Sequence, residues 1–208
     1  MLARCVESQA INTVNAMNAG RAVSAPVVAV ELGAGSGLVS VAAGAAGLHA
    51  IATEQESGMP YLRANAAANA GLFAEQHPGS CTVQTLHWGT AADVATVTAT
   101  VARLTRMGGS ACADGAPALL LGSDLTYLPA VMEPLAETLA KLAGPQTIVW
   151  IAHDDASHPG CPKHRATFFG TPQDTRHQAA SLQTPQPAPA PRDDAEPDGR
   201  TEWQGTHT

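Results

Sequence analysis

The sequence predicts an α/β protein with a doubly wound parallel sheet, and two observations lead to this fold class. Apolar runs with the length of buried strands alternate with helix-like segments between residues 26 and 152, which is the pattern of βαβ units. The first of these runs ends at a cluster of glycines, where such sheets commonly bind a ligand. We therefore expect helices on both faces of the sheet and a ligand at the carboxyl ends of its strands.

The first half of the chain supplies three of the expected strands. The first is rich in valine and almost without polar side chains, as in a strand buried on both faces, and the third alternates apolar and polar residues. These strands are residues 26–32, 48–53 and 81–86. Small residues, or apolar residues at helical spacing before a glycine, predict the helices between them. These helices are residues 37–47 and 59–70, and a short helix that ends at Gly20 is expected before the first strand, at residues 8–20.

The second half supplies two more strands, at residues 117–121 and 147–152, with an amphipathic helix over residues 131–142 between them. Residues 91–106 are rich in Ala, Thr and Val, and the sequence leaves their secondary structure open. The glycine-containing stretch 107–116 is expected to be a loop.

The 208 residues suit one domain with tails. We place an N-terminal segment at residues 1–24 and the domain at residues 25–154. Beyond it, residues 155–208 are dominated by Pro, Gln, Ser, Asp and Gly. Such a composition buries too little apolar surface to offset the entropy of ordering, so we expect this tail to be disordered.

Composition and charge exclude several classes of function. The formal net charge of −7 leaves no basic surface for a phosphate backbone, so nucleic acid is not an expected partner. The four cysteines, Cys5, Cys81, Cys112 and Cys161, form no Cys-x-x-Cys pair, which favours reduced thiols. No secretory signal or membrane-spanning run is evident, so we expect a soluble cytoplasmic protein, with organellar targeting and oligomeric state left open.

The glycine cluster after the first strand predicts a nucleotide-like ligand. Gly33, Gly35 and Gly37 allow the backbone to approach a ligand closely, and the loop opens a helix whose first N–H groups are unpaired. A dinucleotide fingerprint that starts at Gly33 needs glycine at position 38, which is Leu38. The spacing therefore disfavours a dinucleotide.

Two acidic residues point to S-adenosylmethionine instead. Glu31 ends the first strand, where a carboxylate would balance a sulfonium and an ammonium but repel a pyrophosphate. Glu54 ends the second strand, where an acid can accept hydrogen bonds from both ribose hydroxyls. The alternatives are a solvent-exposed acid at a strand end for Glu31 and a helix N-terminal acid for Glu54.

Several of these segments resemble the seven-β-strand protein-lysine methyltransferases of the methyltransferase-like, non-histone branch. The matching segments are residues 30–38, 53–54, 62–69, 86–89 and 122–127. An Asp-x-x-Tyr after the fourth strand, here Asp124 and Tyr127, marks this branch. The resemblance implies a Rossmann-like sheet, S-adenosylmethionine as cofactor, and a lysine of a protein such as a chaperone or a translation factor as the methyl acceptor.

The resemblance also implies roles for particular residues. Trp88 would flank the adenine, the alternative being a core tryptophan. Asp124, next to the cofactor, and Tyr127 would orient the incoming amine; alternatively Asp124 caps the helix near Pro129 and Tyr127 packs beneath it. For Asn65 and Asn69, one helical turn apart, we expect hydrogen bonds from helix to loop.

The chain departs from the family after the fifth strand, where Pro-rich sequence stands in place of a helix and a β-hairpin. We therefore expect the sheet to lack the C-terminal hairpin. Two other functions stay open: methylation of a different substrate, and a non-catalytic binding module. No metal is expected, because His158, Cys161 and His164 lack a standard zinc spacing.

Overall fold

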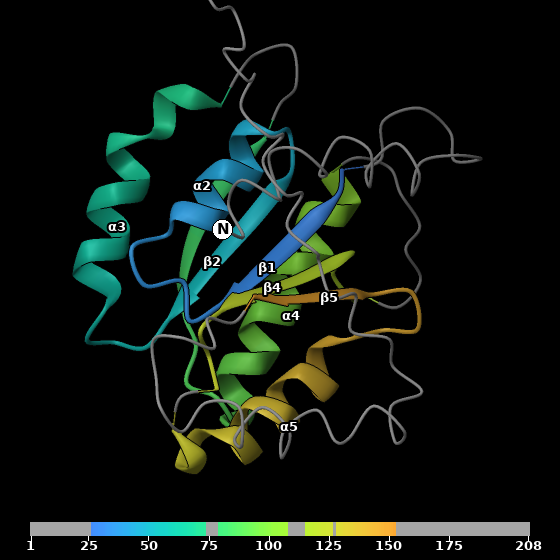
Figure 1. Ribbon diagram of the computed structural model, residues 1–208. Helices are drawn as coiled ribbons and strands as arrows, with labels where there is room; N and C mark the ends of the chain where they lie inside the picture. Colours follow the sequence, from blue (N-terminus) through green and yellow to red (C-terminus); the bar gives the residue numbers. More distant parts are fainter. Residues whose placement is uncertain (1–25, 74–78, 108–114, 127, 153–208) are drawn as a thin grey trace, which may run out of the picture.

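Five parallel strands form the centre of the protein, in the order β3-β2-β1-β4-β5 (Figure 1). The computed structural model describes residues 26–73, 79–107, 115–126 and 128–152. The strands are β1 Val28–Leu32, β2 His49–Glu54, β3 Ser80–Thr85, β4 Leu119–Ser123 and β5 Ile148–Ala152. All four neighbouring pairs are parallel, which confirms the predicted α/β class with a doubly wound sheet.

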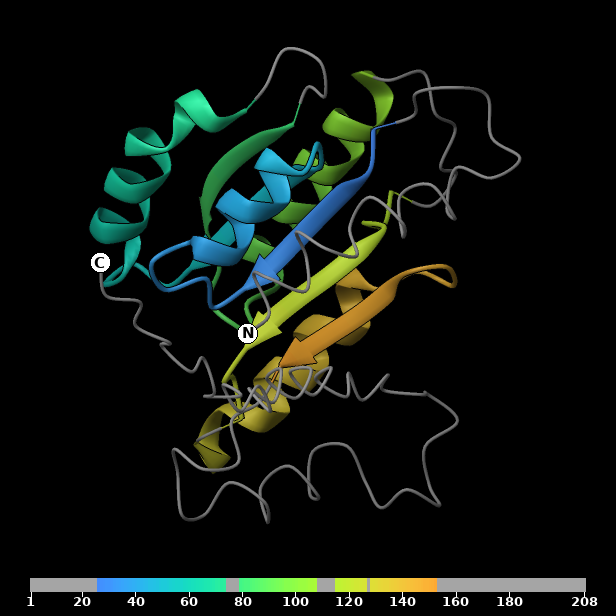
Figure 2. The same ribbon diagram turned by 45° about the horizontal axis from the view of Figure 1, so that its top comes forward.

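Helices connect the strands and cover both faces of the sheet, α2 and α3 on one and α4 and α5 on the other (Figures 1 and 2). The helices are α2 Leu38–Ala45, α3 Met59–Ala68, α4 Ala91–Met107 and α5 Met132–Leu142. Short 3-10 turns at Ala70–Leu72 and Pro129–Val131 follow α3 and precede α5. Each connection runs from the carboxyl end of one strand to the amino end of the next.

Alternation along β1 divides the core into two layers, because successive strand residues point to opposite faces. Ala29 packs in the cluster that holds Val39 and Ala43 of α2. Val30 and Leu32 pack in the second cluster, which contains the apolar faces of α4 and α5. Glu31 therefore points to the same face as α2.

Helix α4 fills the segment whose secondary structure the sequence left open. Its buried residues Val94, Val97, Val101 and Leu104 recur every three or four positions and face the core. Four of its threonines donate a hydroxyl to the carbonyl four residues earlier, at 2.9–3.1 Å. Their side chains are thus satisfied within the helix.

Several predicted boundaries differ from the structure by one or two residues. β4 runs to Ser123, past the predicted end at residue 121, because Gly122 and Ser123 pair with Ile151 and Ala152 of β5. The helix predicted from residue 131 is preceded by the turn Pro129–Val131. The expected helix over residues 8–20, the segment 1–24 and the tail 155–208 lie outside the described residues.

Candidate cofactor site

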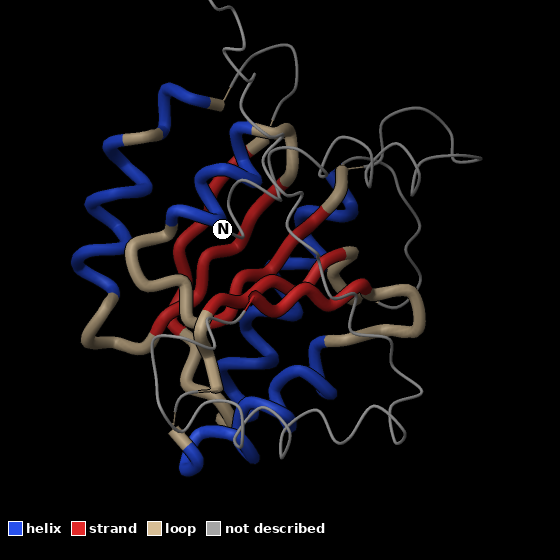
Figure 3. Tube along the Cα trace, in the orientation of Figure 1, coloured by secondary structure: helices blue, strands red, loops and turns tan. Residues whose placement is uncertain are grey.

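The site lies where the strand order reverses, at the carboxyl ends of the central strands. The chain runs from β1 outward to β2 and β3, and then crosses back to β4 on the other side of β1. Ligands of doubly wound sheets bind at such a switch point. Figure 3 shows the connecting loops, in tan, gathered at this edge of the sheet.

The glycines of the loop after β1 serve two different purposes. Gly33, Gly35 and Gly37 all have positive φ, +59°, +54° and +81°. A Cβ on Gly33 would lie 2.9 Å from Leu125 Cδ2, and one on Gly37 would lie 2.5 Å from Leu62 Cδ1, so a side chain at either position would have to displace a leucine of the protein. A Cβ on Gly35 would meet nothing within 4 Å. Gly35 therefore borders open space, where a ligand can approach the backbone.

Hydrogen bonds to the neighbouring elements hold the loop in place. The Ala34 N–H donates to the Thr53 carbonyl at 2.8 Å, and the Thr53 hydroxyl donates to the Glu31 carbonyl at 2.6 Å. From α3, Asn65 Nδ2 donates to the Ser36 carbonyl at 3.1 Å, which confirms the predicted bond from helix to loop. The same prediction for Asn69 is wrong, because its Nδ2 donates to the Asn65 carbonyl in its own helix.

Glu54, at the end of β2, reaches across to the glycine loop. Its Oε2 accepts the Gly35 N–H at 2.9 Å, and its Oε1 accepts the Gln55 N–H at 2.8 Å. A carboxylate offers about four acceptor positions, so positions remain for other donors. Two ribose hydroxyls can donate to the remaining acceptor positions, because the carboxylate lies next to the open space at Gly35.

Glu31 lies behind the loop rather than at the surface. It is 3% exposed, and its Oε2 accepts the Ser40 backbone N–H at 2.9 Å and the Ser40 hydroxyl at 2.5 Å. The alternative of a solvent-exposed acid at a strand end is therefore wrong. Burial raises the pKa of Glu31 to about 7, with Ser40 opposing the shift and the Glu54 charge adding to it.

Trp88 lies beside the glycine loop, against the core. The half-buried indole packs on the cluster that contains Leu32 and Leu125, and its Cζ2 would lie 3.2 Å from a Cβ on Gly33. The core role is thus observed for part of the ring. Contact with an adenine stays a prediction.

Asp124 follows β4 with a backbone conformation that is uncommon for a residue other than glycine. Its φ is +54°, and its N–H donates to the Ala152 carbonyl at 2.9 Å, so the end of β5 holds the turn. The turn Pro129–Val131 has Leu128 at its N-cap, so Asp124 is not the N-cap residue of that segment. The side chain is exposed at the carboxyl edge, and Tyr127 lies outside the described residues.

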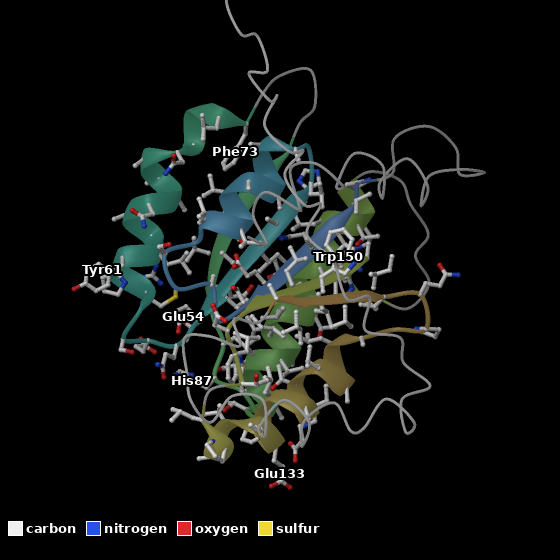
Figure 4. All side chains as sticks on the ribbon, viewed as in Figure 1. Glu54, Tyr61, Phe73, His87, Glu133 and Trp150 are labelled. Carbon is white, nitrogen blue, oxygen red and sulfur yellow. The ribbon has the colours of Figure 1, made fainter. Side chains whose placement is uncertain are left out.

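A histidine and an aspartate at the same edge were not predicted from the sequence. His87 follows β3, and its backbone N–H and its Nδ1 both lie 2.8 Å from Asp93 Oδ2, in the first turn of α4. Figure 4 shows His87 and Glu54 on the same side of the molecule, near the ends of β3 and β2. A histidine directly before Trp88 was the available signal, but its partner depends on the fold of the intervening turn.

Neither a metal cluster nor a membrane-spanning helix is found in the described part of the chain. Residues 26–73, 79–107, 115–126 and 128–152 contain no group of three or more His, Cys, Asp or Glu side chains able to hold a metal ion. Over the same ranges, every helix is too short or too polar to cross a bilayer. The histidines and cysteine considered for zinc, at positions 158, 161 and 164, lie outside these ranges.

Comparison with known proteins matches residues 3–102 to the family described as lysine methyltransferase. This segment, just under half of the chain, is similar to the lysine methyltransferase family. The match contains the glycine loop, Glu31, Glu54 and Trp88, and it confirms the family expected from the sequence. It also supports S-adenosylmethionine as the cofactor of this site.

A curated relative and several solved structures are similar over part of the chain. Protein N-lysine methyltransferase METTL21A of Danio rerio is 28% identical over 123 residues, which are 59% of this chain and 47% of that protein. The chain thus spans about half the length of this lysine methyltransferase.

The solved structures are more distant. The glycopeptide N-methyltransferase MtfA complexed with S-adenosylmethionine is 15% identical with a TM-score of 0.42, over 67% of this chain and 52% of that one. The ribosomal protein L11 methylase from Lactobacillus delbrueckii subsp. bulgaricus is 19% identical with a TM-score of 0.40, over 75% and 67% of the two chains.

Proposed function

We propose that this chain binds S-adenosylmethionine and transfers its methyl group to a lysine side chain of a non-histone protein. The proposal rests on the hydrogen bond that the Gly35 N–H donates to Glu54. This bond lies next to open space, at the switch point of the sheet. The similarity of residues 3–102 to the lysine methyltransferase family supports the choice of acceptor.

Different residues at this edge of the sheet act on different parts of the cofactor. Glu54 accepts the ribose hydroxyls, the backbone around Gly35 lies against the nucleoside, and Trp88 flanks the adenine. Glu31, once ionised above its pKa of about 7, provides a negative potential from behind the loop for the cationic end, without touching it. Once bound, the cofactor supplies an electrophilic methyl on a positively charged sulfur.

Methyl transfer to an amine requires alignment and a neutral nucleophile. Asp124, on the opposite side of β1 from Glu54, accepts a hydrogen bond from the lysine amine and holds it in line with the methyl group. Tyr127 assists in the same task. Partial desolvation would favour the neutral amine. As its lone pair forms the N–C bond, the methyl–sulfur bond would break, S-adenosylhomocysteine would leave, and the proton of the methylated amine would pass to solvent.

The acceptor proteins belong to the cytoplasm, and chaperones or translation factors are our candidates. This part of the proposal depends on the resemblance between the segment Gly122–Tyr127 and the non-histone branch. Reduced thiols and the acidic balance of the chain are compatible with it.

Labelled cofactor tests the proposal directly. The chain is incubated with cell lysate and S-adenosylmethionine carrying an isotopic methyl label, and labelled proteins are identified by mass spectrometry. Label on lysine of a defined protein, lost with Asp124→Asn, is the expected result. Label on another residue type or on small molecules would contradict the lysine assignment, and no label despite cofactor binding would indicate a binding module.

A further inference from the structure

Strand β5 forms the edge of the sheet beyond β4, and its apolar side chains are poorly covered (Figure 2). The strand reads Ile-Val-Trp-Ile-Ala, without a charged residue. Every residue of β1 is buried, whereas none of β5 is. Ile148 and Val149 are each 37% exposed, and successive residues point to opposite faces, so apolar surface is exposed on both faces of this edge.

The backbone of β5 also has polar groups on its outer side. The Ile148 N–H donates to the Ala118 carbonyl at 2.9 Å, so Ile148 directs its backbone groups toward β4. Because this direction alternates along a strand, the backbone groups of Val149 and Ile151 point away from β4. Within the described part of the chain, no strand lies on that side. Each of these two residues therefore offers an N–H and a C=O to a further strand.

β5 lacks the features that usually prevent an edge strand from pairing with another chain. Such strands carry a charge, a proline or a bulge. Residues 148–152 contain neither a charged residue nor a proline, and their register with β4 runs without interruption from one end to the other. The edge can therefore accept another strand.

The strand that best fits this edge is β5 of a second copy of the chain. An apolar edge favours an equally apolar, β-branched partner, and residues 153–208, which follow β5, contain no Val, Ile or Tyr. The opposite edge of the sheet, β3, reads Ser-Cys-Thr-Val-Gln-Thr and is mostly polar. Pairing of β5 with β3 of another copy would also repeat without end, whereas two β5 strands related by a two-fold axis close at two copies.

We propose that two copies of the chain associate through their β5 strands, antiparallel about a two-fold axis at Trp150, and so form one continuous sheet. With the axis at this position, Val149 of each copy lies opposite Ile151 of the other, and their outward N–H and C=O groups pair. Trp150 lies opposite Trp150 of the second copy, on the face where it already packs against the cluster that contains Ala29 and Leu121. Contact between the two indoles covers apolar surface of both copies.

The cofactor site stays open in this arrangement. The strands of the two copies run in opposite directions, so the two carboxyl edges, each with its Glu54, lie at opposite ends of the joined sheet. A pair of five-residue strands is a small interface, so the association is expected to be weak and to depend on concentration. Self-association and cofactor binding can thus be measured independently.

Cysteine cross-linking tests the register of the two strands. Trp150→Cys is oxidised with glutathione disulfide, and the cross-linked peptides are identified by mass spectrometry, which separates them from any bond between native cysteines. Directly opposite residues of this kind have Cα atoms about 4.5 Å apart, within the range of a disulfide, so a bond between the two copies of position 150 is expected. Ile148→Cys, on the same face, is the matched control. It lies opposite position 152, so it should cross-link only when mixed with Ala152→Cys.

Charge substitutions test the association without added cysteines. In sedimentation velocity between about 1 µM and about 100 µM, the average mass of the wild type should rise toward that of two chains. Val149→Lys and Ile151→Glu should each remain single chains, because an unpaired charge opposes pairing at an edge. An equimolar mixture of the two should associate, since position 149 of one variant lies opposite position 151 of the other. Leu72→Lys, at an exposed apolar residue after α3, should behave like the wild type.

Thermal melting of each variant shows whether it is folded before its mass is interpreted. A wild type that remains a single chain at about 100 µM would overturn the inference. So would folded Val149→Lys that associates as well as the wild type, a bond between two copies of position 148 as frequent as that at 150, or growth beyond two chains. None of these results bears on the proposed function, because a single chain that binds S-adenosylhomocysteine in calorimetry keeps its cofactor site.

Discussion

The Glu31 carboxyl group is buried and accepts few hydrogen bonds, and these two features determine how it affects the stability of the protein at different pH values. The two hydrogen bonds that Glu31 accepts both come from Ser40, and they do not compensate for the desolvation of the carboxylate. The pKa of Glu31 therefore rises from 4.5 to about 7. Between these two values the folded protein holds a proton on Glu31 that the unfolded chain has released. Stability from this group is therefore complete below pH 4.5 and is lost as the pH rises through about 7.

Replacing Glu31 with glutamine should flatten this dependence. The rise in pKa corresponds to about 3 kcal/mol at most, so the free energy of unfolding of the wild type should fall by about 1–3 kcal/mol more than that of Glu31→Gln between pH 5 and pH 8. Urea unfolding at both pH values measures the difference, with Glu56→Gln as an exposed control. Parallel curves for Glu31→Gln and the wild type would show that Glu31 is not the group concerned.

Asp124 offers a second test at the scale of one residue, because its backbone and its side chain have different roles. With φ at +54°, a Cβ is disfavoured, so Asp124→Gly should be about 1 kcal/mol more stable than Asp124→Ala. Both variants remove the carboxylate and should lose lysine methylation equally. Thermal melting measures the difference in stability, and the labelling assay measures the loss of methylation. An alanine variant as stable as the glycine variant would show that the backbone at position 124 is not strained.

The glycine loop is the element in which sequence and structure agree most closely. A valine-rich run followed by glycines could be recognised because both signals are local, and Glu54 could be placed because parallel strands end at one edge. The composition of α4 did not allow its assignment, because Thr and Val favour strands. Only the burial of residues 94, 97, 101 and 104, which lie on one face, makes this segment a helix. The bond between His87 and Asp93 crosses a turn at Gly89, which propensities do not define.

Adding a methyl group at Gly35 should separate folding from binding. Gly35→Ala places a Cβ in open space, so it meets no protein atom, and its positive φ costs only about 1–2 kcal/mol. The same methyl group projects into the space that we assign to the cofactor. The variant should stay folded by circular dichroism and lose S-adenosylmethionine affinity by at least about tenfold. Unchanged affinity would place the cofactor elsewhere.

The order of the strands in the sheet brings the residues of the site together. β1 is central, so its loop is flanked by the ends of β2 and β4, and the site draws Glu54 from one side and Asp124 from the other. Two core clusters, one on each face, hold these ends in register. A ligand across this edge contacts segments far apart in sequence, so binding should raise the unfolding temperature of the entire domain.

We propose that Glu54 and the glycine loop hold S-adenosylmethionine, and calorimetry on two nearby glutamates tests this assignment. Glu54→Ala removes the carboxylate that bonds Gly35, whereas Glu56→Ala removes the same number of atoms from an exposed residue of the turn that follows β2. Loss of a charged acceptor worth about 1.5–3 kcal/mol should weaken binding about tenfold to a hundredfold in Glu54→Ala. Glu56→Ala should bind like the wild type. Equal dissociation constants for Glu54→Ala and Glu56→Ala would show that Glu54 does not hold the cofactor.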